Sequence, residues 1–154
     1  MPVIDIAELP SVVGERATLL GLDLGTKTIG VAASDRDWRF AHPRLVIARK
    51  KFRDDLSALS AVIETEGAEA LVIGLPLHLD GSLSPRAQAA RAFARNVLNA
   101  RDLPIAFWDE RLSTVAAERA MLEMDVSRRR RAERIDSAAA AFILQGALDR
   151  LVGA

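Results

Sequence analysis

Residues 18–33 have the sequence Thr-Leu-Leu-Gly-Leu-Asp-Leu-Gly-Thr-Lys-Thr-Ile-Gly-Val-Ala-Ala, and this stretch decides the fold. Two apolar runs, 18–24 and 29–33, are separated by a short turn that contains Gly25. Runs joined in this way are typical of a β-hairpin. Asp23 belongs to the end of the first run and not to the turn. Because an ionised carboxylate on a buried strand is costly without a cationic partner, Asp23 is a candidate functional residue.

Outward from the hairpin, the hydrophobic pattern alternates between helices and strands. The apolar period becomes helical at Phe52, and the wholly apolar run 70–75 is typical of a strand buried on both faces. Ser84 followed by Pro85 is a strong helix start, because serine caps a helix and proline suits its first position. The predicted strands are 18–24, 29–33, 44–48, 70–75 and 104–108. The predicted helices begin at Phe52, Pro85, Ser113 or Thr114, and Asp136, with an Arg-rich loop before the last.

This order of elements predicts an α/β fold with a mixed sheet. The first three strands form an antiparallel meander, and strand–helix–strand crossovers then add parallel strands. We therefore expect a five-stranded mixed sheet flanked by helices. The length predicts one domain, residues 18–154, after an N-terminal extension, residues 1–17. Asp23 and Glu110 lie at or just beyond the carboxyl ends of inner strands, where ligand sites of open α/β sheets cluster.

The composition excludes several classes of protein. Lys+Arg and Asp+Glu each number 21, so the chain does not coat nucleic acid by bulk charge. The absence of cysteine excludes a disulfide scaffold and thiolate metal sites, and it fits a reducing cytoplasm. No apolar run reaches the roughly 18 residues of a membrane-spanning helix. The N-terminus is acidic and lacks the basic start of a signal peptide.

Three carboxylates that are far apart in the sequence are placed for metal chemistry. Asp23, Glu110 and Asp136 each lie on or beside a predicted core segment. Carboxylates that hold two ions roughly 3.5–4 Å apart are the basis of two-metal phosphoryl chemistry. Each has a simpler alternative: an Asp beside a turn, a strand-end salt bridge, or a helix N-cap. Because neighbouring strand residues point to opposite faces, the pattern alone leaves the choice between Asp109 and Glu110 open.

Basic residues beside these acids are candidates for binding phosphate. Lys27 follows Asp23 by four positions, and Arg111 directly follows Glu110. Four arginines precede the third acid, namely Arg128, Arg129, Arg130 and Arg131. If they bind a phosphate backbone, the affinity will depend on salt. The alternative is a solvated basic loop.

Four blocks of sequence carry a family resemblance. They are Gly-Leu-Asp-Leu-Gly-Thr-Lys-Thr-Ile-Gly-Val-Ala at 21–32, Val-Ile-Gly-Leu-Pro-Leu-His-Leu-Asp-Gly-Ser at 72–82, Trp-Asp-Glu-Arg-Leu-Ser-Thr at 108–114 and Ile-Asp-Ser-Ala-Ala-Ala-Ala-Phe-Ile-Leu-Gln at 135–145. In order and spacing they resemble the bacterial pre-16S rRNA nuclease family, also described as Holliday-junction-resolvase-like. The resemblance covers residues 18–152. A lone Asp-x-Gly-Thr is a weak signal, whereas four blocks in order are specific.

The resemblance implies an RNase H-like fold, in agreement with the predicted five-stranded sheet. It also implies that Asp23, Glu110 and Asp136 form the acidic triad, which selects Glu110 over Asp109. Two features depart from the family. His78 stands where the family more often has Asn, and residues 1–17 are extra. Neither departure touches the triad, but the roles of His78 and of the extension stay open.

The function that these residues predict is a Mg²⁺- or Mn²⁺-dependent nuclease, with two ions held by the three acids. The resemblance implies a small-subunit rRNA precursor as substrate, and a four-way DNA junction is the competitor. A non-catalytic RNA-binding module of ribosome assembly is an alternative of another class, and a sugar-kinase or actin-like ATPase is a further one. We expect a cytoplasmic protein with no membrane partner. We expect a monomer, with a dimer as the alternative, because only Trp38 and Phe40 offer a small apolar patch and both are expected to pack on the sheet.

Overall fold

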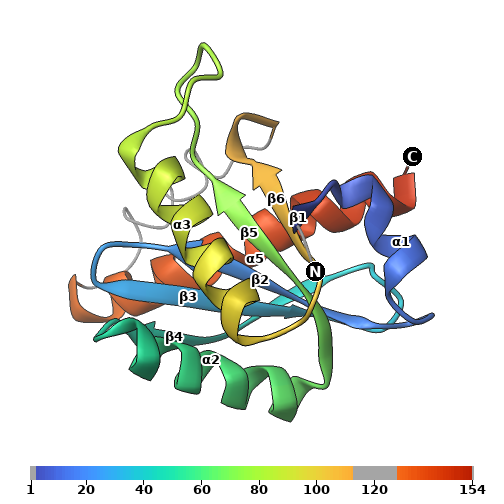
Figure 1. The fold of residues 1–154 in the computed structure, drawn as a ribbon, viewed down its shortest axis with the longest axis horizontal. Coiled ribbons are helices and arrows are strands. Elements are labelled where there is room, and N and C mark those ends of the chain that lie inside the picture. The colour runs from blue at the N-terminus through green and yellow to red at the C-terminus, as the bar shows by residue number, and fades with distance from the viewer. Residues whose placement is uncertain (1–2, 113–127, 154) are drawn as a thin grey trace.

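The predicted hairpin is the centre of the structure, a computed structural model that describes the backbone of residues 3–112 and 128–153 (Figure 1). Side chains are described for residues 3–112 and 137–152. The hairpin strands are β2 (Thr18–Leu24) and β3 (Thr28–Ser34), and they pair antiparallel. Both are buried along almost their whole length, as their apolar sequence requires. The hairpin therefore forms the middle of the sheet and carries Asp23 within the core.

The sheet has six strands in the order β1-β6-β5-β2-β3-β4, one more than predicted. On one side of the hairpin, β4 (Ala41–Ala48) pairs antiparallel with β3. On the other side, β5 (Ala68–Leu75) and β6 (Ile105–Asp109) continue the sheet in parallel. The extra strand, β1 (Val3–Ile4), pairs parallel with the edge of β6. A strand of two residues is too short for its alternation to be recognised in the sequence, which explains the difference.

Residues 3–12 pack onto the domain instead of extending away from it. After β1, the short helices η1 (Ile6–Glu8) and α1 (Leu9–Val12) follow. Leu9 is completely buried, and Ile6 is nearly so, in the same core cluster as Trp108. The predicted N-terminal extension thus contributes hydrophobic core to the sheet edge.

Helices cover both faces of the sheet (Figure 1). The helices α2 (Phe52–Glu66) and α3 (Pro85–Ala100) pack on one face, and α5 (Arg128–Gly153) packs on the other. The predicted helix start at Ser84 is confirmed, because its side chain accepts a hydrogen bond of 3.0 Å from Ala87 N. None of the helices in the described part of the chain is both long and apolar enough to span a membrane.

The start of the last helix was predicted wrongly. The helix α5 begins at Arg128, so Arg128–Arg131 belong to its first turns and not to a loop, and Asp136 lies inside the helix and does not cap it. Arginine, glutamate and alanine are strong helix formers, and residues 128–135 contain neither glycine nor proline. Their charge suggested a loop, but their helix propensity prevails. The helix predicted to start at Ser113 or Thr114 lies outside the described residues.

Trp38 and Phe40, in the connection between β3 and β4, have different environments. Trp38 packs against the core beneath α5, and its indole N–H donates to the carbonyl of Ala17 at 2.6 Å. Phe40 is 60% exposed, so the prediction that it packs on the sheet was wrong. Phe40 directly precedes β4, which is an edge strand with mostly exposed side chains.

Candidate active site

Asp23 lies near the end of β2 on the side of the sheet that faces α5. Asp23 is only 5% exposed. Gly21 marks this face, because a Cβ added there would lie 2.8 Å from the carbonyl oxygen of Ala140 in α5. Residues two apart on a strand share a face, so Asp23 shares that of Gly21. The helix can approach only because residue 21 has no side chain.

Glu110 lies over the adjacent strand, on the same face. A Cβ added to Gly74 would lie 3.0 Å from Glu110 Oε2 and 2.5 Å from Cδ1 of Ile143 in α5. In the parallel register, Leu22 pairs with Ile73, so Asp23 and Gly74 follow as neighbours at the strand ends. Adjacent strands are about 4.8 Å apart. The fold therefore brings Asp23 and Glu110 to the same end of the sheet, and the missing side chain of Gly74 lets the Glu110 carboxylate approach the backbone of β5.

Asp109 has a different environment from Glu110. β6 ends at Asp109, and Glu110 begins the short helix η2 (Glu110–Leu112). Arg111 donates to Asp109 through Nε, at 3.0 Å, and through Nη2, at 2.7 Å. These hydrogen bonds lower the pKa of the Asp109 carboxyl below its usual value. The strand-end salt bridge considered as an alternative thus exists, between Arg111 and Asp109.

Asp136 belongs to the part of α5 that approaches this end of the sheet. It lies one helical turn before Ala140, whose carbonyl oxygen abuts Gly21. In Figure 1, α5 runs back across the sheet, with its first turns toward the β2–β3 turn. The side chains of Asp136 and of Arg128–Arg131 lie outside the described residues. For these residues the structure gives only their backbone position on α5.

Arg111 also anchors the loop that follows β5. Its Nη1 donates to the carbonyl of Leu79 at 3.3 Å, and Gly81, with φ of 88°, passes close to the same guanidinium. His78 lies in this loop, where its backbone N–H donates to the carbonyl of Ser82 at 2.9 Å. Two of the guanidinium nitrogens of Arg111 are engaged by Asp109, so the residue predicted to bind phosphate has a structural role here.

Two arginines that the sequence analysis missed hold the backbone just after Asp23. Arg86, in the first turn of α3, donates to the carbonyl of Leu24 at 3.1 Å, and its Nη2 lies 4.0 Å from Asp23 Oδ1. Arg49 donates to the carbonyl of Gly25 at 2.8 Å. Lys27, in the same turn, is exposed. The only sequence signal was the short distance of Arg86 from the Ser84-Pro85 helix start, and it does not reveal the contact.

The donor set at this site suits a hard divalent cation. Asp23 and Glu110 offer carboxylate oxygens, the ligand type that Mg²⁺ and Mn²⁺ prefer. Glu110 Oε2 approaches the backbone of β5 at Gly74, where a Cβ would lie 3.0 Å from it. Within residues 3–112 and 137–152, no three acidic or histidine side chains form a metal-binding group. The third predicted acid, Asp136, lies outside the residues whose side chains are described.

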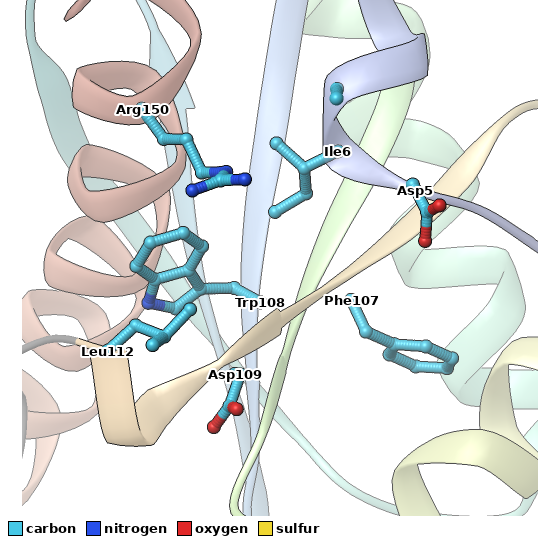
Figure 2. Close-up of a pocket in the computed structure, with 8 residues that line it drawn as sticks. Asp5, Ile6, Phe107, Trp108, Asp109, Leu112 and Arg150 are labelled. Atoms are coloured by element: carbon cyan, nitrogen blue, oxygen red, sulfur yellow. The ribbon is translucent and has the colours of Figure 1, made fainter. Parts of the chain in front are cut away.

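A pocket of about 290 Å³ lies beside the same strand end but apart from the acids (Figure 2). It lies between η1, β6 and α5, with Ile6, Trp108, Asp109 and Arg150 among its lining residues. Figure 2 shows the Arg150 side chain extending from α5 toward the Trp108 ring. Neither Asp23 nor Glu110 lines this pocket. The candidate site is thus the strand end that carries Asp23 and Glu110, and not this pocket.

Solved structures with a similar fold include Holliday junction resolvases. Thermus thermophilus RuvC in complex with a Holliday junction substrate matches with a TM-score of 0.55, over 89% of this chain and 96% of that chain, at 13% identity. The yeast mitochondrial Holliday junction resolvase Ydc2 matches with a TM-score of 0.50, over 96% of this chain and 83% of that chain, also at 13% identity. At such low identity the likeness concerns the fold alone, and it confirms the RNase H-like architecture.

Sequence comparison identifies much nearer relatives. A protein of Chelativorans sp. (strain BNC1) named "Putative pre-16S rRNA nuclease" is 60% identical over 151 residues, which are 98% of this chain and 94% of that protein. Proteins with this name from Mesorhizobium japonicum and Brucella canis are 61% and 59% identical, over 93% and 98% of this chain and 86% and 93% of their own. The profile of the RuvX family, described as "Holliday junction resolvase", matches residues 17–150. This chain therefore belongs to the RuvX family.

Proposed function

We propose that this protein is a metal-dependent nuclease that hydrolyses phosphodiester bonds in structured nucleic acid, with the precursor of 16S rRNA as its substrate. The observation that carries the proposal is the position of Asp23 and Glu110 at one end of the sheet, on either side of β5, where the missing side chain of Gly74 lets the Glu110 carboxylate come close. Family membership supports nuclease activity, and the names of the bacterial relatives support the substrate. Such processing takes place in the cytoplasm.

In this proposal, Asp23, Glu110 and Asp136 hold two divalent ions, Mg²⁺ or Mn²⁺. Bound ions of this kind activate a water molecule and stabilise the leaving oxygen. The chain's own part is to hold the carboxylates in place. β2 fixes Asp23, Gly74 makes room for Glu110, and the close approach of α5 at Gly21 brings the turn with Asp136 toward them.

The basic residues bind and orient the substrate. Lys27 neutralises charge near the scissile phosphate, and Arg128–Arg131 contact the backbone from the first turns of α5. Arg111 holds the loop after β5 and offers its remaining donors to the substrate. A monomer is sufficient, because one site cuts one strand of an RNA precursor, whereas symmetric resolution of a junction needs two sites related by a two-fold axis.

The test is cleavage of a 16S rRNA precursor and of a four-way DNA junction, side by side, with and without Mg²⁺ or Mn²⁺. Wild type is compared with Asp23→Asn, Glu110→Gln and Asp136→Asn, and Asp109→Asn is the matched control for the neighbouring acid. We expect the three triad variants to be folded and to lose turnover severely, because a missing ligand misplaces an ion that stabilises the transition state. The Asp109 variant should retain most of its turnover.

Each outcome separates the competing functions. Near-wild-type turnover in any triad variant removes that residue from the mechanism. Paired nicks in the junction by a stable dimer favour the resolvase activity that the family description names. If neither substrate is cut but the RNA is bound, the protein is a non-catalytic RNA-binding module.

A further inference from the structure

All three lysines of this chain lie at one end of the molecule. Lys27 is in the turn between β2 and β3, and Lys50 and Lys51 connect β4 to α2. Arg53, in the first turn of α2, lies beside them in the sequence. We call Lys27, Lys50, Lys51 and Arg53 the basic end cluster. All four of its residues are exposed.

Backbone contacts tie the basic end cluster to the strand that carries Asp23. Arg49 N donates to the carbonyl of Lys27 at 2.8 Å, and the Arg49 side chain donates to the carbonyl of Gly25 at the same distance. Lys50 is the next residue along, and its own N–H donates to Asp55 at 2.8 Å. In Figure 1 the β2–β3 turn, the start of α2 and the first turns of α5 lie toward the same end of the molecule.

The charge of the basic end cluster is not neutralised by the described protein. None of its four side chains forms an ion pair within residues 3–112 and 137–152. Other arginines of this part of the chain do have carboxylate partners, namely Arg16, Arg44, Arg49, Arg86, Arg101 and Arg111. In a chain of zero net charge, the cluster is thus a local excess of positive charge.

The cations of the β4–α2 connection stand at the N-terminus of α2, where the helix dipole does not favour them. Lys51 is the N-cap residue, and its side chain makes no capping hydrogen bond. Cations near a helix N-terminus oppose the helix dipole, whereas Asp54 and Asp55 in the same turn favour it. Lys50, Lys51 and Arg53 therefore stand where the helix itself does not favour positive charge. Departures of this kind from local structural preference are expected at functional sites.

We propose that Lys50, Lys51 and Arg53 of the basic end cluster bind the phosphodiester backbone of the substrate beyond the cut site, over the β4–α2 connection. This inference rests on the proposed function and adds a binding surface to it. Lys27 lies in the β2–β3 turn, whereas Lys50, Lys51 and Arg53 lie at the start of α2. The helix α2 packs on the face of the sheet opposite α5. Lys50, Lys51 and Arg53 therefore hold a stretch of backbone different from that held by the first turns of α5.

The test compares two variants that lose the same charge. The test variant is Lys50→Ala, Lys51→Ala and Arg53→Ala together. The control is Arg36→Ala, Arg39→Ala and Arg95→Ala together, three exposed arginines outside the cluster, none of which forms an ion pair within the described residues. Fluorescence anisotropy measures binding of an RNA duplex with a single-stranded 5′ extension, and of a four-way DNA junction, as the salt concentration is raised. Turnover and thermal unfolding are measured on the same samples.

We expect the test variant to bind more weakly than the control and to have a flatter salt dependence. The slope should fall by about 0.7–0.9 log unit for each phosphate that the variant no longer neutralises. KM should rise with little change in kcat, because these residues bind substrate and transition state alike. Thermal stability should hold or rise, since the dipole cost is removed. The probe whose affinity falls more, RNA duplex or DNA junction, identifies the backbone that the cluster binds.

Equal affinity and equal salt slopes in the two variants would overturn the proposal and show that the basic end cluster is only solvated surface. This result is separable from a failure of the proposed function. Binding is measured without cleavage, so a protein that cuts neither probe can still show a cluster-dependent slope.

Discussion

Gly74 shows how one absent side chain shapes the candidate site. Its α-carbon faces both the Glu110 carboxylate and the Ile143 side chain, with no room for a Cβ. Gly21 has the same role one strand away, where α5 approaches most closely. At both positions glycine is required by the close approach of neighbouring groups and not by an unusual backbone conformation.

Gly74→Ala should displace Glu110 and impair catalysis. The new methyl group would lie 2.5 Å from Ile143 Cδ1 and 3.0 Å from Glu110 Oε2. We expect at least about a tenfold loss of turnover, or about 1.4 kcal/mol, and a loss of stability of about 1–3 kcal/mol from overpacking. Gly14→Ala is the control, because its Cβ would make only ordinary contact, 3.4 Å from Glu69 Oε1. Wild-type turnover of Gly74→Ala would show that Glu110 does not need this space.

The pair of Asp109 and Arg111 should contribute a pH-dependent stability. Arg111 lowers the pKa of Asp109, so the folded-state pKa is below the unfolded value of about 3.9. The stabilisation is therefore present above about pH 4 and is lost as the pH falls through the folded pKa. Because both side chains are partly exposed, we expect it to be at most about 1 kcal/mol.

A double-mutant cycle measures this stabilisation. Asp109→Asn, Arg111→Gln and the double variant are unfolded in urea at several pH values between neutral and acidic. The coupling free energy should be present at pH 6 and vanish in strong acid. A coupling that stays constant over this range would contradict the ion-pair interpretation.

At the scale of elements, the start of α2 supports the turn after Asp23. Asp55, in the first turn of α2, is 1% exposed and accepts a hydrogen bond from Lys50 N at 2.8 Å. Its other oxygen lies 3.7 Å from Arg49 Nε, and the Arg49 guanidinium carbon is 5.8 Å from the centre of the Phe93 ring. Through its bond to the carbonyl of Gly25, Arg49 joins this buried pair to the β2–β3 turn.

Asp55→Ala should destabilise the fold and also lower activity. Removing one member of a buried ion pair costs about 3–5 kcal/mol, and since Arg49 is partly solvated we expect about 2–4 kcal/mol. Turnover at a temperature where the variant is folded should also fall, because the turn beside Asp23 loses its anchor. Asp54→Ala, an exposed neighbour in the same helical turn, should cost less than about 1 kcal/mol. Urea unfolding and turnover are the measurements, and equal effects of the two substitutions would contradict this role.

At the scale of the whole molecule, the N-terminal segment is the part that the sequence described least well. β1 extends the sheet, and Leu9 is completely buried in the core cluster that contains Trp108 and α5 residues. The segment thereby covers the outer side of β6, the strand that leads to Glu110.

Leu9→Ala should therefore destabilise the whole domain, by about 2–4 kcal/mol, as expected for a buried leucine. Val12→Ala, at a position that is 39% exposed, is the control and should cost less than about 1 kcal/mol. Urea unfolding followed by both tryptophan fluorescence and circular dichroism measures the effect. If the two variants unfold alike, the segment is peripheral to the fold.

Local patterns in the sequence predicted most of the architecture. The apolar runs predicted the hairpin, β5 and β6, and the Ser84-Pro85 pair predicted the start of α3 at Pro85. The strand β1 and the first turns of α5 were not predicted, for different reasons. β1 is too short to show a period, and the arginines of α5 carry a charge that suggested solvent while their propensity favours helix.

For the candidate site, the sequence by itself identified the three candidate acids, Asp23, Glu110 and Asp136. The four sequence motifs identified the family. Only the tertiary structure decided how Asp109 and Glu110 differ, because this depends on where β6 ends and on which face its last residues take. Only the tertiary structure placed Arg49, Arg86 and the basic end cluster beside the strand of Asp23. The physical reason is that hydrophobic period and caps are encoded among near neighbours, whereas a site is made by strand register and helix approach between residues far apart in the chain.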